Sequence, residues 1–331
     1  MVNKIVKLWK QQSFTRQIAI TFILIFLLQL ILVFIITGEH LPKVVENKIL
    51  DFSNLTLYQA SLNVGSVISE YNNSVNKMII DEDFIKYVND LESEDITKVN
   101  KAKQYIKNEM RNLCTYTPEV RCFTIMTDDY VLFSYDRLEI DSIYQNTPAL
   151  HKRYLNETIH DVQYWKKGIW FPTEFYDRQG SQDFYLYTYE RQIYDWYEND
   201  IIGTILISFD ENVLSDICRG AQISDYVENN YLFIVDGDGH IISHYNKQIL
   251  GKKIGDIYNW KIAEEAGESS GMNYPKEVYL DGKKKIVKEE SIPGTDWWII
   301  SVLDYDYITQ SLTDIRKFLI AINMFLGVSV I

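Results

Sequence analysis

The chain has few of the residues that supply disulfides or metal ligands. Its 331 residues include 3 cysteines and 5 histidines. Three cysteines cannot form the paired framework of a small disulfide-stabilised domain. Cys114 and Cys122 are close enough in sequence to pair, but a free thiol on a helix and another on a strand is the favoured interpretation. The composition therefore gives no indication of a disulfide-dependent fold.

Catalytic and cofactor-binding motifs are also missing. The sequence contains no G-x-S-x-G, no H-E-x-x-H, no P-loop and no Rossmann glycine pattern. The DGDG segment at 236–239 is similar to a calcium loop, but its twelfth position is Lys247 instead of the required Glu. His240 and His244 would lie about 13 Å apart along one face of a strand, too far for one ion. We therefore expect no enzyme activity, no cofactor and no metal site in this chain.

Positive charge is scarce beyond the N-terminus. The formal net charge is −13, yet residues 1–17 carry four basic and no acidic residues. Because the apolar runs at 18–37 and 318–331 are uncharged, residues 38–317 carry −17. Nucleic acids and anionic lipid surfaces bind basic patches. The charge balance therefore excludes both as partners of the central region.

Two apolar runs enclose this acidic region. Residues 18–37 read IAITFILIFLLQLILVFIIT, about the length that a helix needs to cross a bilayer. The basic residues before this run predict a cytoplasmic N-terminus and an extracellular central region. A cleavable signal peptide is the alternative, but its apolar core would be shorter and would end at a small-residue cleavage site. We expect residues 317–331 to begin a second, truncated membrane span, with a buried terminal helix as the alternative.

Helical periodicity follows the first apolar run. Apolar residues recur every three or four positions at Val45, Ile49, Phe52 and Leu55, and again at 68–78, which predicts one long amphipathic helix. Two shorter helices are expected at 83–91 and 97–114. The stripe begins before any strand exists to cover it, so its simplest cover is the same helix of a second copy. We therefore expect a homodimer paired along this helix and the membrane spans.

From residue 120 the period changes to that of strands. Strands are expected at 121–127, 130–135, 168–175, 183–194 and 201–209, followed by a helix at 211–222 with Asp210 as its N-cap. The same plan then repeats, with strands at 231–235, 240–244, 276–280, 285–292 and 297–303. Each half is a hairpin, a crossover and three antiparallel strands. The junction between the halves is expected near residues 208–228.

Several segments carry a family resemblance. They are FIVDGDGHIISH (233–244), IPGTDWWIISVLDYD (292–306), and GIWFPTEF followed by LYTYERQIYDWYENDIIGTILISFDENVL (168–175 and 186–214). In this order they resemble a double Cache (dCache_1) domain, an α+β fold with two tandem PAS-like antiparallel sheets on a long N-terminal helix, flanked by transmembrane helices. The segments at 168–175 and 186–214 resemble the extracytoplasmic sensors of Gram-positive histidine kinases that are often paired with AraC-family regulators. The resemblance covers about residues 39–310.

The resemblance implies a domain plan and a function. The sensor region would occupy 38–316, with a helical spine (39–114), a distal module (115–209), a proximal module (210–304) and an exit helix (305–316). It would relay small-molecule binding across the cell membrane to a kinase domain that is missing from this sequence. A chemoreceptor or another Cache-coupled receptor is the alternative. A further alternative is an ectodomain that docks a solute-binding protein and has no small-molecule pocket of its own.

Aromatic residues are concentrated between residues 164 and 197. Aromatic walls with a few polar anchors are typical of small-ligand pockets. The ligand-binding candidates are Trp165, Trp170, Tyr185, Tyr187, Tyr189 and Arg191. The three tyrosines would share one strand face, with Leu186, Thr188 and Glu190 on the other. The alternative is that the aromatic residues fill a sheet core and a dimer face.

The resemblance also bears on the class of ligand. Amino-acid-binding double Cache domains carry an Arg-x-Trp-Tyr motif and an acidic residue five positions after the Gly of the last distal strand. Here the corresponding stretch is YWKKG at 164–168, and five residues after Gly203 is Ser208. Without the acid that holds an ammonium group, an amino-acid ligand is not expected. A neutral polar ligand such as a sugar could stack on the aromatic faces, and delivery by a binding protein is equally open.

Overall fold

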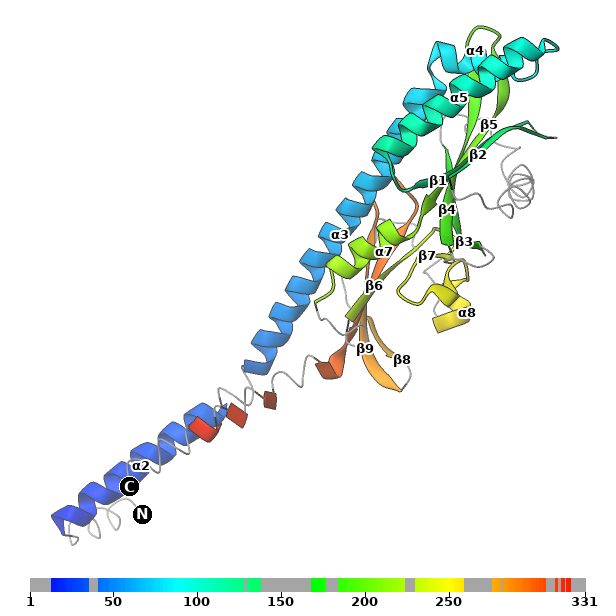
Figure 1. The fold of residues 1–331 in the computed structure, drawn as a ribbon. Coiled ribbons are helices and arrows are strands. Elements are labelled where there is room, and N and C mark those ends of the chain that lie inside the picture. The colour runs from blue at the N-terminus through cyan, green and yellow to red at the C-terminus, as the bar shows by residue number, and fades with distance from the viewer. Residues whose placement is uncertain are drawn as a thin grey trace. The chain divides into compact units, whose positions relative to one another are not determined.

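The computed structural model describes most of the chain as helices and strands (Figure 1). The described residues are 13–35, 41–127, 130–137, 168–176, 184–223, 230–258, 276–280 and 282–307, with short helical pieces at 313–314, 317–318 and 320–322. The chain divides into two compact units, one of Met1–Leu55, Val278–Lys285 and Leu303–Ile331, the other of Thr56–Glu277 and Ile286–Val302. Trp165 and the turn expected at 128–129 lie outside the described residues.

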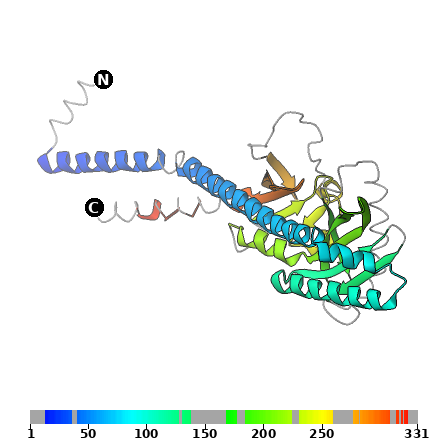
Figure 2. The ribbon, with the colours of Figure 1, turned by 90° about the horizontal axis from the view of Figure 1, so that it is seen from above.

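Among the described residues, four helices precede the first strand. They are α2 (Phe14–Ile35), α3 (Leu41–Ile79), α4 (Glu82–Asp90) and α5 (Ile96–Tyr116). Both shorter helices start at an aspartate that accepts a backbone N–H, Asp81 from Phe84 at 2.9 Å and Asp95 from Thr97 at 2.8 Å. Figures 1 and 2 show α4 and α5 side by side, and the rings of Tyr87 and Tyr105 stack between them at 4.3 Å. The three predicted helices of this region are confirmed.

In the part of the chain that the structure describes, no helix is both long enough and apolar enough to cross a membrane. The spans expected at 18–37 and from 317 onward lie partly outside the described residues.

The first five strands form one antiparallel sheet, called here the distal sheet. They are β1 (Val120–Met126), β2 (Val131–Asp136), β3 (Ile169–Tyr176), β4 (Phe184–Asp195) and β5 (Asp200–Asp210), in the order β2-β1-β5-β4-β3. The helix α7 (Asn212–Gly220) follows. Its N-cap is Glu211, one residue later than expected, although the Asp210 carboxylate still accepts the Asn212 N–H at 3.0 Å.

The second five strands form the proximal sheet. They are β6 (Asn230–Val235), β7 (Ile241–Ser243), β8 (Lys276–Leu280), β9 (Lys283–Ser291) and β10 (Trp298–Asp304), in the order β7-β6-β10-β9-β8. The 3-10 turn η3 (Lys247–Ile249) and the short helix α8 (Ile254–Tyr258) lie between β7 and β8. The two sheets have the same strand order, hairpin first and three strands after it. This confirms the predicted α+β fold with a repeated five-stranded module.

A single stripe of α3 packs into the hydrophobic core. The α3 residues in this core are Leu57, Ala60, Val64, Ile68, Tyr71, Val75 and Ile79. Phe52 and Leu55, which were expected from the sequence on the same apolar stripe as Ile68, are 52% and 54% exposed. That expectation was wrong because the sixteen residues from Phe52 to Ile68 turn a helix by about 160°. Phe52 and Leu55 therefore lie on the face of α3 opposite to Ile68.

Two local features of the second half are explained by hydrogen bonding and burial. The DGDG segment is a turn in which Asp236 Oδ1 accepts the backbone N–H groups of Asp238 and His240 at 3.0 and 2.7 Å. His244 is a packing residue, 2% exposed, and burial lowers its pKa to about 4. The three cysteines are free thiols, as favoured from the sequence.

Candidate functional site

The structure brings three of the predicted site residues together. The Trp170 ring on β3 lies 5.6 Å from the Tyr187 ring and 4.7 Å from the Tyr189 ring, both on β4. Both tyrosines are buried in the hydrophobic core that also contains the α3 stripe. Burial raises the pKa of each phenol, so both are uncharged at neutral pH. This face of the distal sheet is a packed aromatic layer against α3.

The other predicted residues that are described belong to the same side of β4. Tyr185 packs on Phe175 of β3, with ring centroids 5.4 Å apart. Arg191 donates from Nη1 to the side-chain oxygen of Asn76 on α3. Trp165 lies outside the described residues. A ligand-binding role for these six residues stays a prediction.

The opposite face of the distal sheet is made largely of short polar side chains. Strand register brings them into two rows that cross all five strands. From β2 to β3, the first row is Asp136, Cys122, Ser208, Thr188 and Phe171, and the second is Ser134, Thr124, Leu206, Glu190 and Ile169. These ten residues are called the polar face below.

Hydroxyl groups pair across the strands of the polar face. Thr188 Oγ1 lies 2.9 Å from Ser208 Oγ, and Thr124 Oγ1 lies 3.1 Å from Ser134 Oγ. Thr124, Thr188 and Ser208 are at most 6% exposed. Because each hydroxyl has one donor and two acceptor positions, a pair leaves further positions for hydrogen bonds. The face is thus buried and still able to bind a polar group.

Charged side chains stand on and beside this face. The Glu190 carboxylate in its second row is 8% exposed. At the end of β5, Asp210 accepts hydrogen bonds from Arg121 Nη2 at 2.7 Å and Nε at 3.1 Å. Cys122 Sγ lies 3.5 Å from Asp136 Oδ1, and burial raises the pKa of its thiol. Cys122 is therefore a neutral donor and not a reactive thiolate.

The polar face as a unit was not predicted from the sequence. Leu186, Thr188 and Glu190 were expected on one side of β4, but the binding candidates were placed on the aromatic side. One signal for the polar face is present in the sequence of β5. Thr204 and Ser208 lie at alternate positions on either side of Leu206, so they share one face of the strand. Only the register of the strands joins this run to that of β4.

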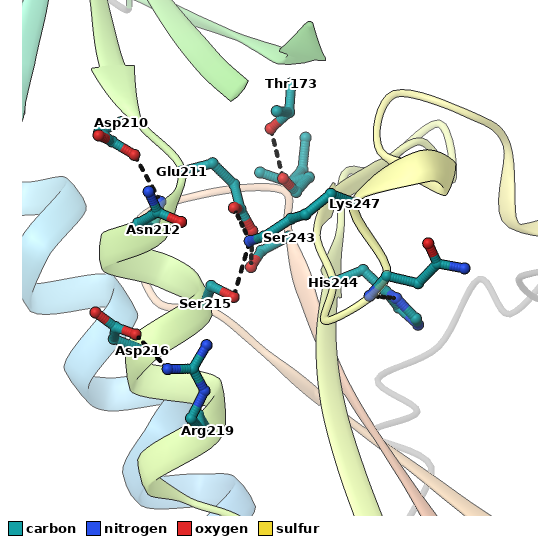
Figure 3. A network of polar contacts seen from close by, with 12 residues as sticks. Thr173, Asp210, Glu211, Asn212, Ser215, Asp216, Arg219, Ser243, His244 and Lys247 are labelled. Carbon is teal, nitrogen blue, oxygen red and sulfur yellow. Dashed lines mark hydrogen bonds and ion pairs between the residues drawn. The ribbon is translucent and has the colours of Figure 1, made fainter. Parts of the chain in front are cut away.

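A buried ion pair lies where β5 ends and α7 begins (Figure 3). Glu211 is fully buried, accepts a hydrogen bond from Ser243 Oγ of β7 at 2.6 Å, and pairs with Lys247 of η3. Lys247 Nζ also donates to Ser215 Oγ of α7 at 3.0 Å. Burial raises the pKa of Glu211, against the lowering effect of Lys247. Thr173 Oγ1 of β3 donates to the Ile242 carbonyl beside this network, so polar contacts join the distal sheet to β7.

Two further features bear on ligand chemistry. Within the described ranges, no group of three or more His, Cys, Asp or Glu side chains is placed to hold a metal ion. A surface depression of about 450 Å³ is lined by Ser66, Ser69, Glu70, Asn73, Ser74 and Lys77. All six residues belong to α3, so one helix alone forms its wall. The polar face is therefore the stronger candidate for a binding surface.

Comparison with known proteins identifies the fold. The ligand-binding domain of Mlp24 with asparagine is 17% identical, aligned over 81% of this chain and 99% of its own, with a TM-score of 0.52. The ligand-binding domain of the Pseudomonas fluorescens chemoreceptor CtaA in complex with L-isoleucine is 14% identical over 79% of this chain and 95% of its own, with a TM-score of 0.50. No curated protein has a significant match.

At such identities the structural likeness shows the fold alone. The family comparison adds the sequence pattern, because residues 43–312 match the Cache domain family (dCache_1). That match covers more than half of the 331 residues and spans α3, both sheets and the start of the segment after β10. The chain therefore belongs to the Cache domain family, as an extracytoplasmic ligand-sensing domain.

Proposed function

We propose that the chain senses a small polar molecule on the polar face of the distal sheet and relays its binding to a signalling domain across the membrane. The observation that carries this proposal is the burial of that face. A buried sheet face is normally apolar, since a buried hydroxyl costs free energy unless it is hydrogen-bonded. Here hydroxyl and carboxylate groups lie on four of the strands, β2, β1, β5 and β4, while Trp170, Tyr187 and Tyr189 lie on the opposite, α3-facing side. Ligand sites place a few polar groups in this way to fix orientation.

The chemistry of the polar face favours a neutral or weakly charged polar ligand. Hydroxyl pairs can donate and accept, and Glu190 supplies the one carboxylate in the second row. The solved relatives hold asparagine and L-isoleucine. Ser208, where the family resemblance calls for an acid, forms a neutral pair with Thr188. The proposal therefore favours a sugar-like or other hydroxyl-bearing ligand over an amino acid, and asparagine and L-isoleucine are the probes that test this choice.

The receptor is proposed to be a sensor histidine kinase anchored in the cell membrane, with a cytoplasmic N-terminus. The support is sequence resemblance, the basic residues at 1–17 and the run at 18–37, which has no charged residue. A chemoreceptor is the second candidate, because the solved relatives above include one by name. The sequence beyond Ile331 distinguishes them, since a phosphoacceptor His indicates a kinase and long heptad helices indicate a chemoreceptor.

A homodimer is proposed along α3. Phe52, Leu55, Tyr58 and Leu62 follow each other at intervals of three, three and four, and each is more than 40% exposed. Residues at this spacing share one helix face. A self-complementary contact between two copies of that face would bury it. The stripe expected from the sequence to pair with a second copy included Phe52 and Leu55.

A ligand screen with matched variants tests the site. Sugars, polyols, asparagine and L-isoleucine are screened by thermal shift, and hits are titrated calorimetrically. Thr188→Val and Ser208→Ala should each weaken a hit at least tenfold, because each removes a hydroxyl from the polar face. Thr117→Val is the control, since Thr117 is equally buried at the end of α5. Equal loss of affinity in all three variants, or a hit unaffected by the first two, contradicts the proposal.

A further inference from the structure

Two hairpin turns and a helix meet at one end of the distal sheet. Strand register pairs Met126, at the end of β1, with Thr204, near the start of β5, so the β1–β2 and β4–β5 turns lie at the same end. The helix α4 stands beside the β4–β5 turn (Figure 1). Asn89 of α4 donates to Asp195 Oδ2 at 2.7 Å, and Tyr130 OH of the β1–β2 turn donates to Glu92.

This end of the module exposes large apolar and aromatic side chains. They are Ile80, Tyr130, Trp196, Tyr197 and Ile201, together called the distal tip. Trp196 is 54% exposed and Tyr197 is 72% exposed, although neighbouring residues of the same turn, such as Asp195, are buried. A cluster of exposed aromatic residues marks an interaction surface more often than scattered single residues do.

The β4–β5 turn holds its aromatic residues in fixed positions. Asp195 Oδ1 accepts the backbone N–H groups of Tyr197 and Glu198 at 2.8 and 3.2 Å. Tyr194 OH donates to Asn199 Oδ1 at 2.6 Å, and Asn199 takes the left-handed φ of 57° that closes the turn. A surface that is already ordered loses little conformational entropy when a partner binds. The turn is thus built to present Trp196 and Tyr197 outward.

The surroundings of the distal tip are acidic. The exposed carboxylates of α4, the α4–α5 turn and the β4–β5 turn are Glu82, Asp83, Glu92, Glu94, Asp95, Glu198 and Asp200, against the lysines Lys86 and Lys98. The Tyr197 hydroxyl is hydrogen-bonded to Glu82, which raises its pKa. A partner must therefore present positive charge around an apolar centre. A second copy of this end would bring like charges together.

We propose that the distal tip is a docking surface for a soluble extracytoplasmic protein that has a lysine- and arginine-rich rim around an apolar depression. The side chains of the distal tip are exposed, whereas small-molecule sites are concave and bury most of the ligand surface, so a folded partner fits this surface better than a free metabolite. Exposed Trp and Tyr at a fixed position are the residues that dominate the affinity of protein interfaces. This inference is independent of the ligand proposed for the polar face.

Site-specific photocrosslinking in intact cells tests the proposal. A photoreactive phenylalanine replaces Tyr197 in the full-length receptor, or, as a matched control, Tyr116 at the end of α5, which is 84% exposed. A protein adduct at position 197 and not at 116 is expected. The captured protein is then identified, purified and titrated against wild type and variants, because capture alone does not establish a specific surface.

The titration has defined outcomes. Trp196→Ala and Tyr197→Ala should each weaken binding at least tenfold, while Tyr116→Ala changes it less than twofold. Glu198→Lys combined with Asp200→Lys should slow association and reduce its salt dependence. The affinity of any small ligand for the polar face should stay unchanged in Trp196→Ala, which separates this proposal from the previous one. An adduct with a second copy, no adduct above the control, or equal affinity for all variants would overturn it.

Discussion

Removing Lys247 tests the buried ion pair that joins α7 to the proximal sheet. In Lys247→Met the Glu211 carboxylate keeps its hydrogen bond from Ser243 but loses its cation. Breaking a buried pair from one side costs about 3–5 kcal/mol. Because the Lys247 side chain is 26% exposed, the lower end applies, and we expect a loss of about 3 kcal/mol in the free energy of unfolding. Urea unfolding followed by circular dichroism measures it.

Two further variants check the physical reason. Glu211→Leu combined with Lys247→Met should recover most of the loss, since apolar replacement of a buried pair is often neutral. Asp216 and Arg219 form an exposed pair on the same helix, 3.2 Å apart and 67% and 71% exposed (Figure 3). Asp216→Asn should therefore change stability by less than about 0.5 kcal/mol.

The pH dependence of Lys247→Met refines the test. Burial raises the pKa of Glu211, and loss of the lysine raises it further, so the variant prefers a protonated Glu211. A group with a raised folded pKa contributes stability at low pH that is lost as the pH rises through that pKa. The deficit against wild type should thus be smaller at pH 5 than at pH 8. A deficit below about 1 kcal/mol, or one equal at both pH values, would refute the reasoning.

Three other predictions concern single residues. Burial lowers the pKa of His244 to about 4, so the stability that its neutral form contributes is present above pH 6.5 and is lost as the pH falls towards 4. Between pH 7 and 4.5 this lowers the free energy of unfolding of the wild type by about 2–3 kcal/mol. In His244→Gln this loss should disappear, as measured by urea unfolding. Single cysteines across 43–55 in a cysteine-free background should crosslink in membranes with helical periodicity, with maxima at Phe52 and Leu55, and a flat profile would exclude a paired α3. Trp170→Ala should cost about 3 kcal/mol, because its ring contacts Tyr187 and Tyr189; a loss of ligand response beyond the unfolded fraction would support a binding role as well.

Much of the fold follows from residue periodicity. Intervals of three and four predict α3, α4 and α5, and alternation predicts the strands within about two residues of their observed ends. The repeat of hairpin, crossover and three strands predicts two equal sheets, because strands that follow each other closely in sequence pair as neighbours. Local periodicity suffices here because each element's hydrogen bonds and side-chain directions depend on neighbouring residues alone.

Tertiary structure decided which faces these elements bury. Alternation assigns Tyr187 and Thr188 to opposite sides of β4, but both sides are buried in the folded chain, and only the packing of α3 shows that the aromatic side is core. Likewise, the pairing of Glu211 with Lys247 joins residues 36 positions apart. The sequence by itself determined the elements, since their rules are local. The polar face, the ion pair and the distal tip depend on contacts between segments distant in the chain, and no local pattern specifies those.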